Sequence, residues 1–372
     1  DYQYTLTHLF TQHNQMGQDL GEYINTDFRP KLEDRLRQNN HLITPYVNVH
    51  DGIPEAGFSQ FLDTPRYSTG YTALWNTLGL MIETHMLKPY DERVYATKSM
   101  LESLVDLSAE EHQNIKTKIA DNFKTFQKDE YYKFGYVVDS TQFETLDFKG
   151  YEAEYIISDI TDQKRLKYNT TKPFSKPVKY FNDYKATDSV RIPDYYIVKS
   201  AWKKVINHLK QNNIEMQILE KDSSINVETY RIENYKTLNS VYEGHYLHYA
   251  TEVISSVEKQ VFKKGDVMIP TQQAGIKYII ETLEPECEDS FFNWNFFDPI
   301  LQQKEGFSAY VFEDYAEDFL KNNPEVKMDF IIKKTTDENF KNNAYAQLDW
   351  LYKQSPLYEK AHLRYPVVRV FD

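Results

Sequence analysis

The hydrophobic pattern of the chain changes near Lys128, and this change constrains the fold more than any other feature of the sequence. Before it, segments with apolar residues at helical spacing alternate with short strand-like runs. After it come short runs rich in Tyr, Val, Ile and Thr, separated by Asn, Asp, Gly and Pro. The first pattern is typical of an α/β domain, and the second of strands joined by turns. We therefore predict an α/β domain over residues 1–127 and a β-rich α+β accessory domain over residues 128–372, which could divide into two subdomains near residue 195.

Four helices and two strands are predicted in the first domain. Apolar residues recur at helical spacing in "LTHLFTQHNQMGQDLGEYI", which predicts a helix over residues 6–24. A short helix is expected over residues 31–38, and a third over "DERVYATKSMLESLVDL". Ser108 and Glu111 have the spacing of a capping box and predict the start of a further helix there. "HLITPYVNV" and "GLMIETHML" read as strands, the second more deeply buried than the first.

Strands dominate the prediction for the second domain. They are expected in "YVVDS", "EAEYIIS", "PVKYF", "IEMQILE", "NVETYRI", "HYLHYATEVI" and "DVMIP". The clearest helix is "IVKSAWKKVINHLKQNN", with Val198, Ala201, Val205 and Leu209 among its apolar residues. Its end is expected at Asn212. Two more helices are predicted in "YAEDFLKNN" and "NAYAQLDWLYKQ".

Composition excludes some partners. The formal net charge is −13 over 372 residues, which argues against nucleic-acid binding because that binding depends on neutralising phosphates with Lys and Arg. No segment approaches the ~18 consecutive apolar residues of a membrane-spanning helix. The single cysteine, Cys287, rules out an internal disulfide and lies among acids that would raise a thiol pKa. A nucleophilic role for Cys287 is therefore not expected.

Few motifs point directly to chemistry. There is no phosphate-binding Gly-rich loop and no nucleophile elbow. The cluster of Glu243, His245, His248 and Glu252 could ligate a metal on a helix, but His245 and His248 would point to opposite faces of a strand. Satisfied structural histidines are the alternative, and the strand-type composition favours it.

The stretch "TPRYSTGYTALWNTLGLMIETHML" (64–87) places the carboxylate of Glu83 in an apolar, strand-like run. A buried ionised carboxylate costs several kcal/mol unless it is paired. Glu83 could be a structural residue paired with a nearby base, or a general base facing the loop that precedes it. In the second interpretation, Arg66, Tyr67 and Tyr71 are the candidate substrate contacts. The pattern alone leaves both interpretations open.

A family resemblance favours the second interpretation. The run "GFSQFLDTPRYSTGYTALWNTLGLMIETHMLKPYDERV" resembles the C-terminal part of the catalytic domain of zinc carboxypeptidases of the carboxypeptidase A type, in a bacterial branch with a long C-terminal extension. "DYQYTLTHLFTQH" is similar to the segment that follows the third zinc ligand of that branch, and "LEPECEDSFFNWNFFDPIL" and "FSAYVFED" are similar to its C-terminal region. The resemblance implies that Glu83 is the general base beside the zinc-bound water. It also implies that Tyr67 or Tyr71 is the substrate-binding tyrosine.

The same resemblance implies that this chain lacks the zinc-binding residues of the family. The zinc ligands and the arginine that binds the substrate carboxylate would precede Asp1, so zinc is expected in the intact parent protein and not in this chain alone. The chain would then be an inactive C-terminal portion of a hydrolase of C-terminal peptide or peptide-like amide bonds, stabilised by the missing N-terminal part or by homodimerisation. The family also implies export, although the chain carries no signal peptide.

The alternative function belongs to another class of protein. The run "SFFNWNFFD" (290–298) could form an aromatic platform of a non-catalytic module that binds peptide or glycan. Aromatic runs of globular chains usually bury, so we expect these side chains to belong to the core.

Overall fold

A sheet of three strands forms the centre of the N-terminal unit (residues 1–123) in the computed structural model, which describes residues 1–49 and 52–371. Its strand order is β2 (Ile43–Pro45), β1 (Leu6–Phe10) and β4 (Leu80–Thr84). β1 is parallel to β2 and antiparallel to β4, with Thr7 opposite Glu83. All five residues of β1 are buried, as expected of a central strand. β4 is an edge strand of this sheet.

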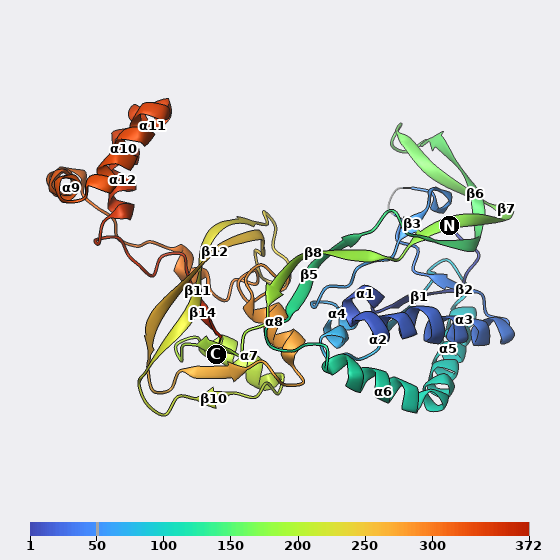
Figure 1. Ribbon diagram of the computed structural model, residues 1–372. Coiled ribbons are helices and arrows are strands. Elements are labelled where there is room, and N and C mark those ends of the chain that lie inside the picture. Colours follow the sequence, from blue (N-terminus) through green and yellow to red (C-terminus); the bar gives the residue numbers. More distant parts are fainter. Residues whose placement is uncertain (50–51, 372) are drawn as a thin grey trace.

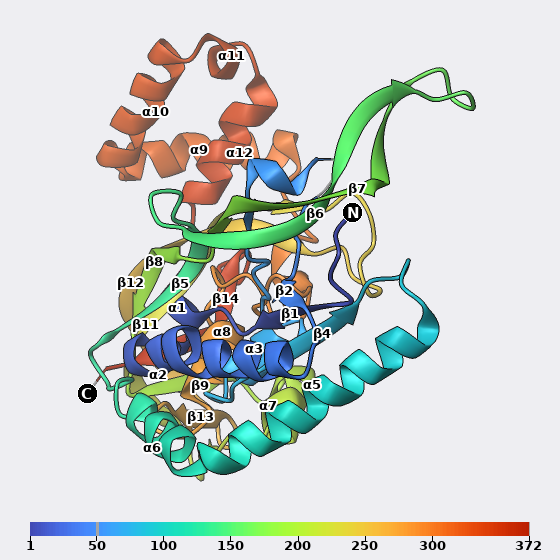
Figure 2. The same cartoon turned by 90° about the vertical axis from the view of Figure 1, so that its right-hand side faces the viewer.

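Helices cover one face of this sheet and bury its apolar side chains (Figure 1). Leu6 and Phe10 of β1 share a core with Leu20, Leu32 and Met100 of the helices. The helical elements are α1 (His13–Met16), α2 (Gln18–Tyr23), the π-helical turn Ile24–Phe28, α3 (Arg29–Gln38), α5 (Tyr90–Glu110) and α6 (His112–Phe123). The 3₁₀ turn Pro54–Ala56 and the short helix α4 (Ser68–Ala73) lie in the connection between β2 and β4. α5 packs against α3, β1 and β4 (Figure 2).

Long β-ribbons follow the N-terminal unit. β6 (Glu144–Ile157) and β7 (Lys164–Phe181) form a hairpin, and β7 also pairs with β3 (Phe58–Ser59) of the N-terminal unit. β5 (Tyr131–Val138) pairs with β8 (Tyr184–Arg191) in a ribbon that connects the two halves of the molecule (Figure 1). The predicted boundary after residue 127 falls between α6 and β5. The whole chain is of mixed α/β class and contains several small sheets.

An antiparallel sheet of six strands forms the C-terminal unit (residues 195–301 and 364–370). Its order is β10 (Gln217–Ile218), β13 (Val267–Pro270), β9 (Tyr195–Val198), β14 (Arg364–Val370), β11 (Ser223–Thr237) and β12 (His248–Phe262). α7 (Lys203–Gln211) and α8 (Ile276–Leu283) pack on it and share its main core, and the 3₁₀ turn Asp298–Leu301 follows. The predicted core role of "SFFNWNFFD" is confirmed, because Phe291, Phe292 and Phe297 are buried there.

Four helices inserted between the 3₁₀ turn and β14 form a helical subdomain. They are α9 (Ala309–Asn322), α10 (Pro324–Thr336), α11 (Glu338–Lys341) and α12 (Ala344–Gln354). Figures 1 and 2 show this subdomain projecting from the C-terminal unit. Its small core is built by Phe312, Ala316, Leu351 and Tyr352.

Several sequence predictions about secondary structure are wrong. Residues 6–10 form a strand instead of a helix: because β1 is buried on both faces, its apolar residues do not alternate, and Leu6, Leu9 and Phe10 match helical spacing. Ser108 lies inside α5 and caps nothing, since α6 begins at His112 after Glu111. Val198 belongs to strand β9, so the helix predicted there starts only at Lys203.

Candidate functional site

Glu83 is exposed, which corrects the expectation that it is buried. Leu80 and Ile82 pack into the helix-side core, so Glu83, which alternates with them, projects from the other face of the sheet. β4 is also an edge strand, so among the residues described no strand pairs with it on the edge opposite β1. Glu83 therefore needs no buried counter-charge.

The charge of Glu83 acts on two tyrosines, Tyr2 and Tyr46. Tyr46 follows β2 and donates its backbone N–H to the carbonyl of His8, over 2.8 Å, while Tyr2 precedes β1. Burial, followed by the negative charge of Glu83, raises the pKa of the Tyr2 phenol to about 12. The same two causes raise the pKa of the Tyr46 phenol. Both hydroxyls therefore stay protonated at neutral pH.

His85 continues this cluster two residues beyond Glu83. Its Nε2 atom lies 2.7 Å from Asp1 Oδ1, and its ring packs edge-on against Tyr2 with the centroids 4.5 Å apart. Burial and the charge of Lys88 lower the pKa of the imidazole. The first residues of the chain and the end of β4 thus meet at one place on the sheet.

Two of the other predicted site residues, Arg66 and Tyr71, contact the C-terminal unit instead. Both Nε and a terminal nitrogen of Arg66 bind Asp289 Oδ1, at 2.7 and 2.6 Å, and the guanidinium lies over the Trp294 ring. The Tyr71 hydroxyl donates to Asn212 Oδ1 over 2.6 Å. Tyr67 is partly exposed and packs edge-on against Phe61. The role of these three side chains in substrate binding stays a prediction.

Helix α4, which contains Tyr71 and directly follows Arg66 and Tyr67, lies away from Glu83. The Thr11 hydroxyl donates to the carbonyl of Thr69 in α4 over 3.2 Å, whereas Glu83 pairs with Thr7. Thr11 follows Thr7 by four positions of extended chain, a distance of roughly 13 Å. Gly70 lies so close to the Thr64 carbonyl that a side chain at this position would clash with it. The loop therefore folds tightly at the far end of β1.

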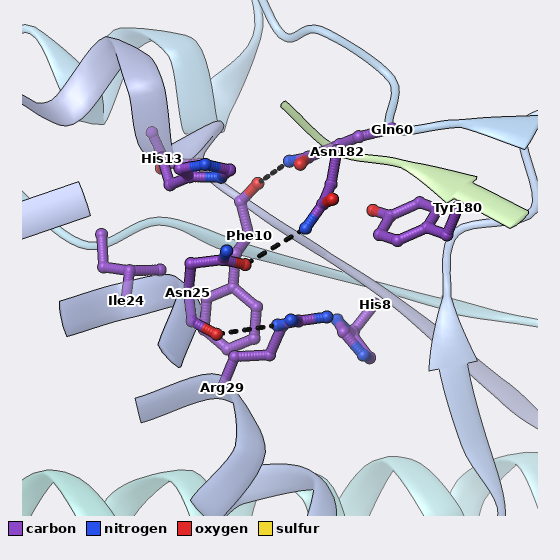
Figure 3. Close-up of a pocket in the computed structure, with 10 residues that line it drawn as sticks. His8, Phe10, His13, Ile24, Asn25, Arg29, Gln60, Tyr180 and Asn182 are labelled. Atoms are coloured by element: carbon purple, nitrogen blue, oxygen red, sulfur yellow. Dashed lines mark hydrogen bonds between the residues drawn. The ribbon is translucent and has the colours of Figure 1, made fainter. Parts of the chain in front are cut away.

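A second polar group of residues lies on the helix side of β1 and was not predicted from the sequence (Figure 3). His8, Arg29, Gln60 and Asn182 line a cavity of about 20 Å³. His8 Nδ1 and Asn182 Oδ1 are buried without a hydrogen-bond partner in the part of the chain described. A cavity of this volume holds about one water molecule, which would satisfy such atoms. The only sequence signal was a histidine inside the apolar run "LTHLF".

Lys277 of α8 ties the C-terminal unit to the N-terminal unit. Its Nζ atom donates to the carbonyls of Gln15 and Ala73, both at 3.0 Å, and to Asn76 Oδ1 at 3.1 Å. Burial lowers the pKa of this ammonium to about 8. With all three donors in use, Lys277 is a structural residue that fixes the two units together.

Glu281, one turn after Lys277, predicts a pH dependence of stability. Burial raises its pKa from 4.5 to about 7, with the Tyr132 hydroxyl as hydrogen-bond donor over 2.8 Å. Between these values the folded state binds more protons than the unfolded state, so the free energy of unfolding contributed by this group falls as pH rises. Urea unfolding of Glu281→Gln should show a smaller fall between pH 4.5 and 7 than the wild type. An unchanged slope in Glu281→Gln, with the exposed Glu102→Gln as control, would contradict this assignment.

The residues described contain no group of three or more His, Cys, Asp or Glu side chains that could hold a metal ion. His248, one of the weighed candidates, is held by Asp298 Oδ1 at 3.0 Å and the Thr237 hydroxyl at 2.9 Å. Burial and then the charges of Glu281 and Glu284 raise the pKa of the Cys287 thiol, as predicted in direction.

Comparison with known proteins gives no match: no family model, no curated protein and no solved structure is similar to this chain. Over the described residues, no helix has the length and apolar character needed to cross a membrane.

Proposed function

We propose that this chain is the C-terminal part of a zinc carboxypeptidase-like hydrolase in which Glu83 is the general base. The observation that carries the proposal is the position of Glu83, which stands exposed on an edge strand and whose charge helps to raise the pKa of Tyr2 and Tyr46. A general base must be accessible to the water from which it takes the proton. The sequence resemblance assigns the same role to the same residue.

The open side of the N-terminal sheet supports the proposal that the domain continues beyond this chain. Buried residues of α5 form one stripe, yet a second apolar stripe on the same helix is exposed. Val94, Leu101 and Val105 in this second stripe are 45%, 50% and 67% exposed. A helix that is apolar on two faces is typical of the interior of a larger domain. Val94 and Leu101 line a groove together with Tyr90 and Thr84, the last residue of β4.

The chemistry available to the described residues is proton transfer and hydrogen bonding. Glu83 would accept the proton of the attacking water and pass it to the leaving amine. A bound zinc ion would supply the Lewis acidity that polarises the scissile carbonyl. The described residues do not form a site for that ion, and its ligands belong, in the proposal, to the sequence before Asp1. A peptide substrate and export of the parent protein are parts of the same proposal.

The proposal is tested by expressing the chain together with the residues encoded upstream of Asp1 and incubating it with peptides and zinc. Release of single C-terminal residues is the expected result. Hydrogen exchange at the amides of Leu80–Thr84 should also slow relative to the chain starting at Asp1, because added strands would cover the edge. A folded, zinc-loaded extended chain that cleaves no peptide would refute the proposed activity.

The alternative function, an aromatic binding module, was suggested by the aromatic run at residues 290–298, which is largely buried. Three phenylalanines of "SFFNWNFFD" are buried, and the Arg66 guanidinium lies 5.5 Å from the centre of the Trp294 ring. We therefore do not propose a platform there.

A further inference from the structure

The helical subdomain has one helix, α10, that packs only Val326 and Phe330 against the small core. α10 contains no buried residue over its 13 positions. Met328, Ile331 and Ile332 are 59%, 46% and 50% exposed, and they lie on one side of the helix at the spacing i, i+3, i+4. Exposed apolar stripes of this kind mark surfaces at which proteins associate.

Two lysines flank the apolar stripe of α10. Lys327 and Lys334 are exposed and bracket Ile331 at the spacing i, i+4, i+7, so all three share one face. Neither lysine forms an ion pair with any residue that the structure describes. This face of α10 is therefore apolar and cationic, and it suits a partner that is apolar and acidic.

The neighbouring helix α9 presents a face of that complementary kind. Glu313 and Asp314 are exposed and form no ion pair within the described part of the chain, whereas Glu317 and Asp318 are paired with Lys321. Tyr310 and Val311, one turn earlier, are 84% and 57% exposed. At 14 and 13 residues, α9 and α10 have nearly the same length, so each could cover the other along its whole length.

We propose that the helical subdomain is a homodimerisation module in which α10 of one chain packs on α9 of a second copy, and the reverse. A two-fold axis makes each contact occur twice, as in most soluble homodimers. Met328, Ile331 and Ile332 would be covered by Tyr310 and Val311 of the second chain, and Lys327 and Lys334 would face Glu313 and Asp314. The proposal is independent of the proposed hydrolytic function.

Charge reversal tests this interface. If α10 pairs with α9 of the second chain, two charge-reversed variants that each fail to dimerise should dimerise with one another. One variant carries Lys327→Glu and Lys334→Glu, and the other carries Glu313→Lys and Asp314→Lys. Like charges would then face each other in both homodimers, so each variant alone should show a dimer Kd raised by more than about tenfold. In an equimolar mixture opposite charges meet at both contacts, and dimers should reappear as heterodimers.

The measurement is analytical ultracentrifugation over a range of protein concentrations, with circular dichroism to confirm folding. The pair Lys203→Glu and Lys210→Glu is a matched control, since these exposed lysines have the same spacing on α7. The control should dimerise as the wild type does. A wild type that stays monomeric at every concentration, or charge variants that dimerise normally, or a mixture without heterodimers, would overturn the proposal.

Discussion

Replacing Glu83 by glutamine in the chain extended upstream of Asp1 is expected to lower kcat/KM for C-terminal peptide hydrolysis by about 10²–10⁴, the usual contribution of general acid–base catalysis. Glutamine preserves the size and hydrogen bonding of the side chain but cannot accept the proton. Because Glu83 is exposed on an edge strand, the substitution should leave the free energy of unfolding nearly unchanged. Steady-state hydrolysis of a peptide series measures the effect.

The control for this substitution is Glu92→Gln. Glu92 is also exposed and lies in the first turn of α5, in the segment that follows β4. Its replacement should change kcat/KM by no more than a few-fold. If Glu83→Gln behaves like Glu92→Gln while zinc content and folding are preserved, the carboxylate is a structural residue and the proposed mechanism is wrong.

Arg369→Met is expected to lower the free energy of unfolding by about 3–5 kcal/mol, as found when one partner of a buried ion pair is removed. Arg369 lies on β14 and is 5% exposed. Its guanidinium binds Glu228 Oε2 at 2.8 Å and Glu284 Oε1 at 3.2 Å, and it also donates to the Tyr230 hydroxyl and the Arg191 carbonyl. Without the arginine, the buried Glu284 carboxylate loses its cation. Urea unfolding at neutral pH measures the loss.

Two further variants separate burial from charge in this network. Arg37→Met removes an exposed pair with Asp34 and should cost no more than about 1 kcal/mol. Adding Glu284→Gln to Arg369→Met removes the carboxylate that has lost its partner, so the double variant should be more stable than Arg369→Met alone. If Arg369→Met costs as little as Arg37→Met, the buried network does not stabilise the C-terminal unit.

Local patterns predicted many elements correctly because those elements bury only one face. α3 and α5 carry apolar residues at helical spacing, and the strands of the β6–β7 hairpin have strand-type composition. β1 was missed because it is buried on both faces and loses the alternation that marks a strand. α10 was missed because its apolar residues lie on two sides of the helix, with Val326 and Phe330 against the small core and Met328, Ile331 and Ile332 exposed.

Of the candidate site, only the strand that carries Glu83 could be predicted from the local sequence. The sequence placed Glu83 on a strand, which the structure confirms, but its exposure depends on which strands lie beside β4. Likewise, nothing local indicates that Arg66 binds Asp289, 223 residues later. The three carbonyl and amide acceptors around Lys277 are also more than 200 residues away in the sequence. Such contacts follow from tertiary packing and not from spacing.

Zinc binding by the extended chain tests the central claim most directly. Equilibrium dialysis followed by elemental analysis should find one zinc ion per extended chain, none in the chain that starts at Asp1, and peptide hydrolysis only in the zinc-loaded extended form. These results would place Glu83 in an active site completed by upstream residues. An extended chain that folds, shows slowed exchange at β4 and still binds no zinc would contradict the account.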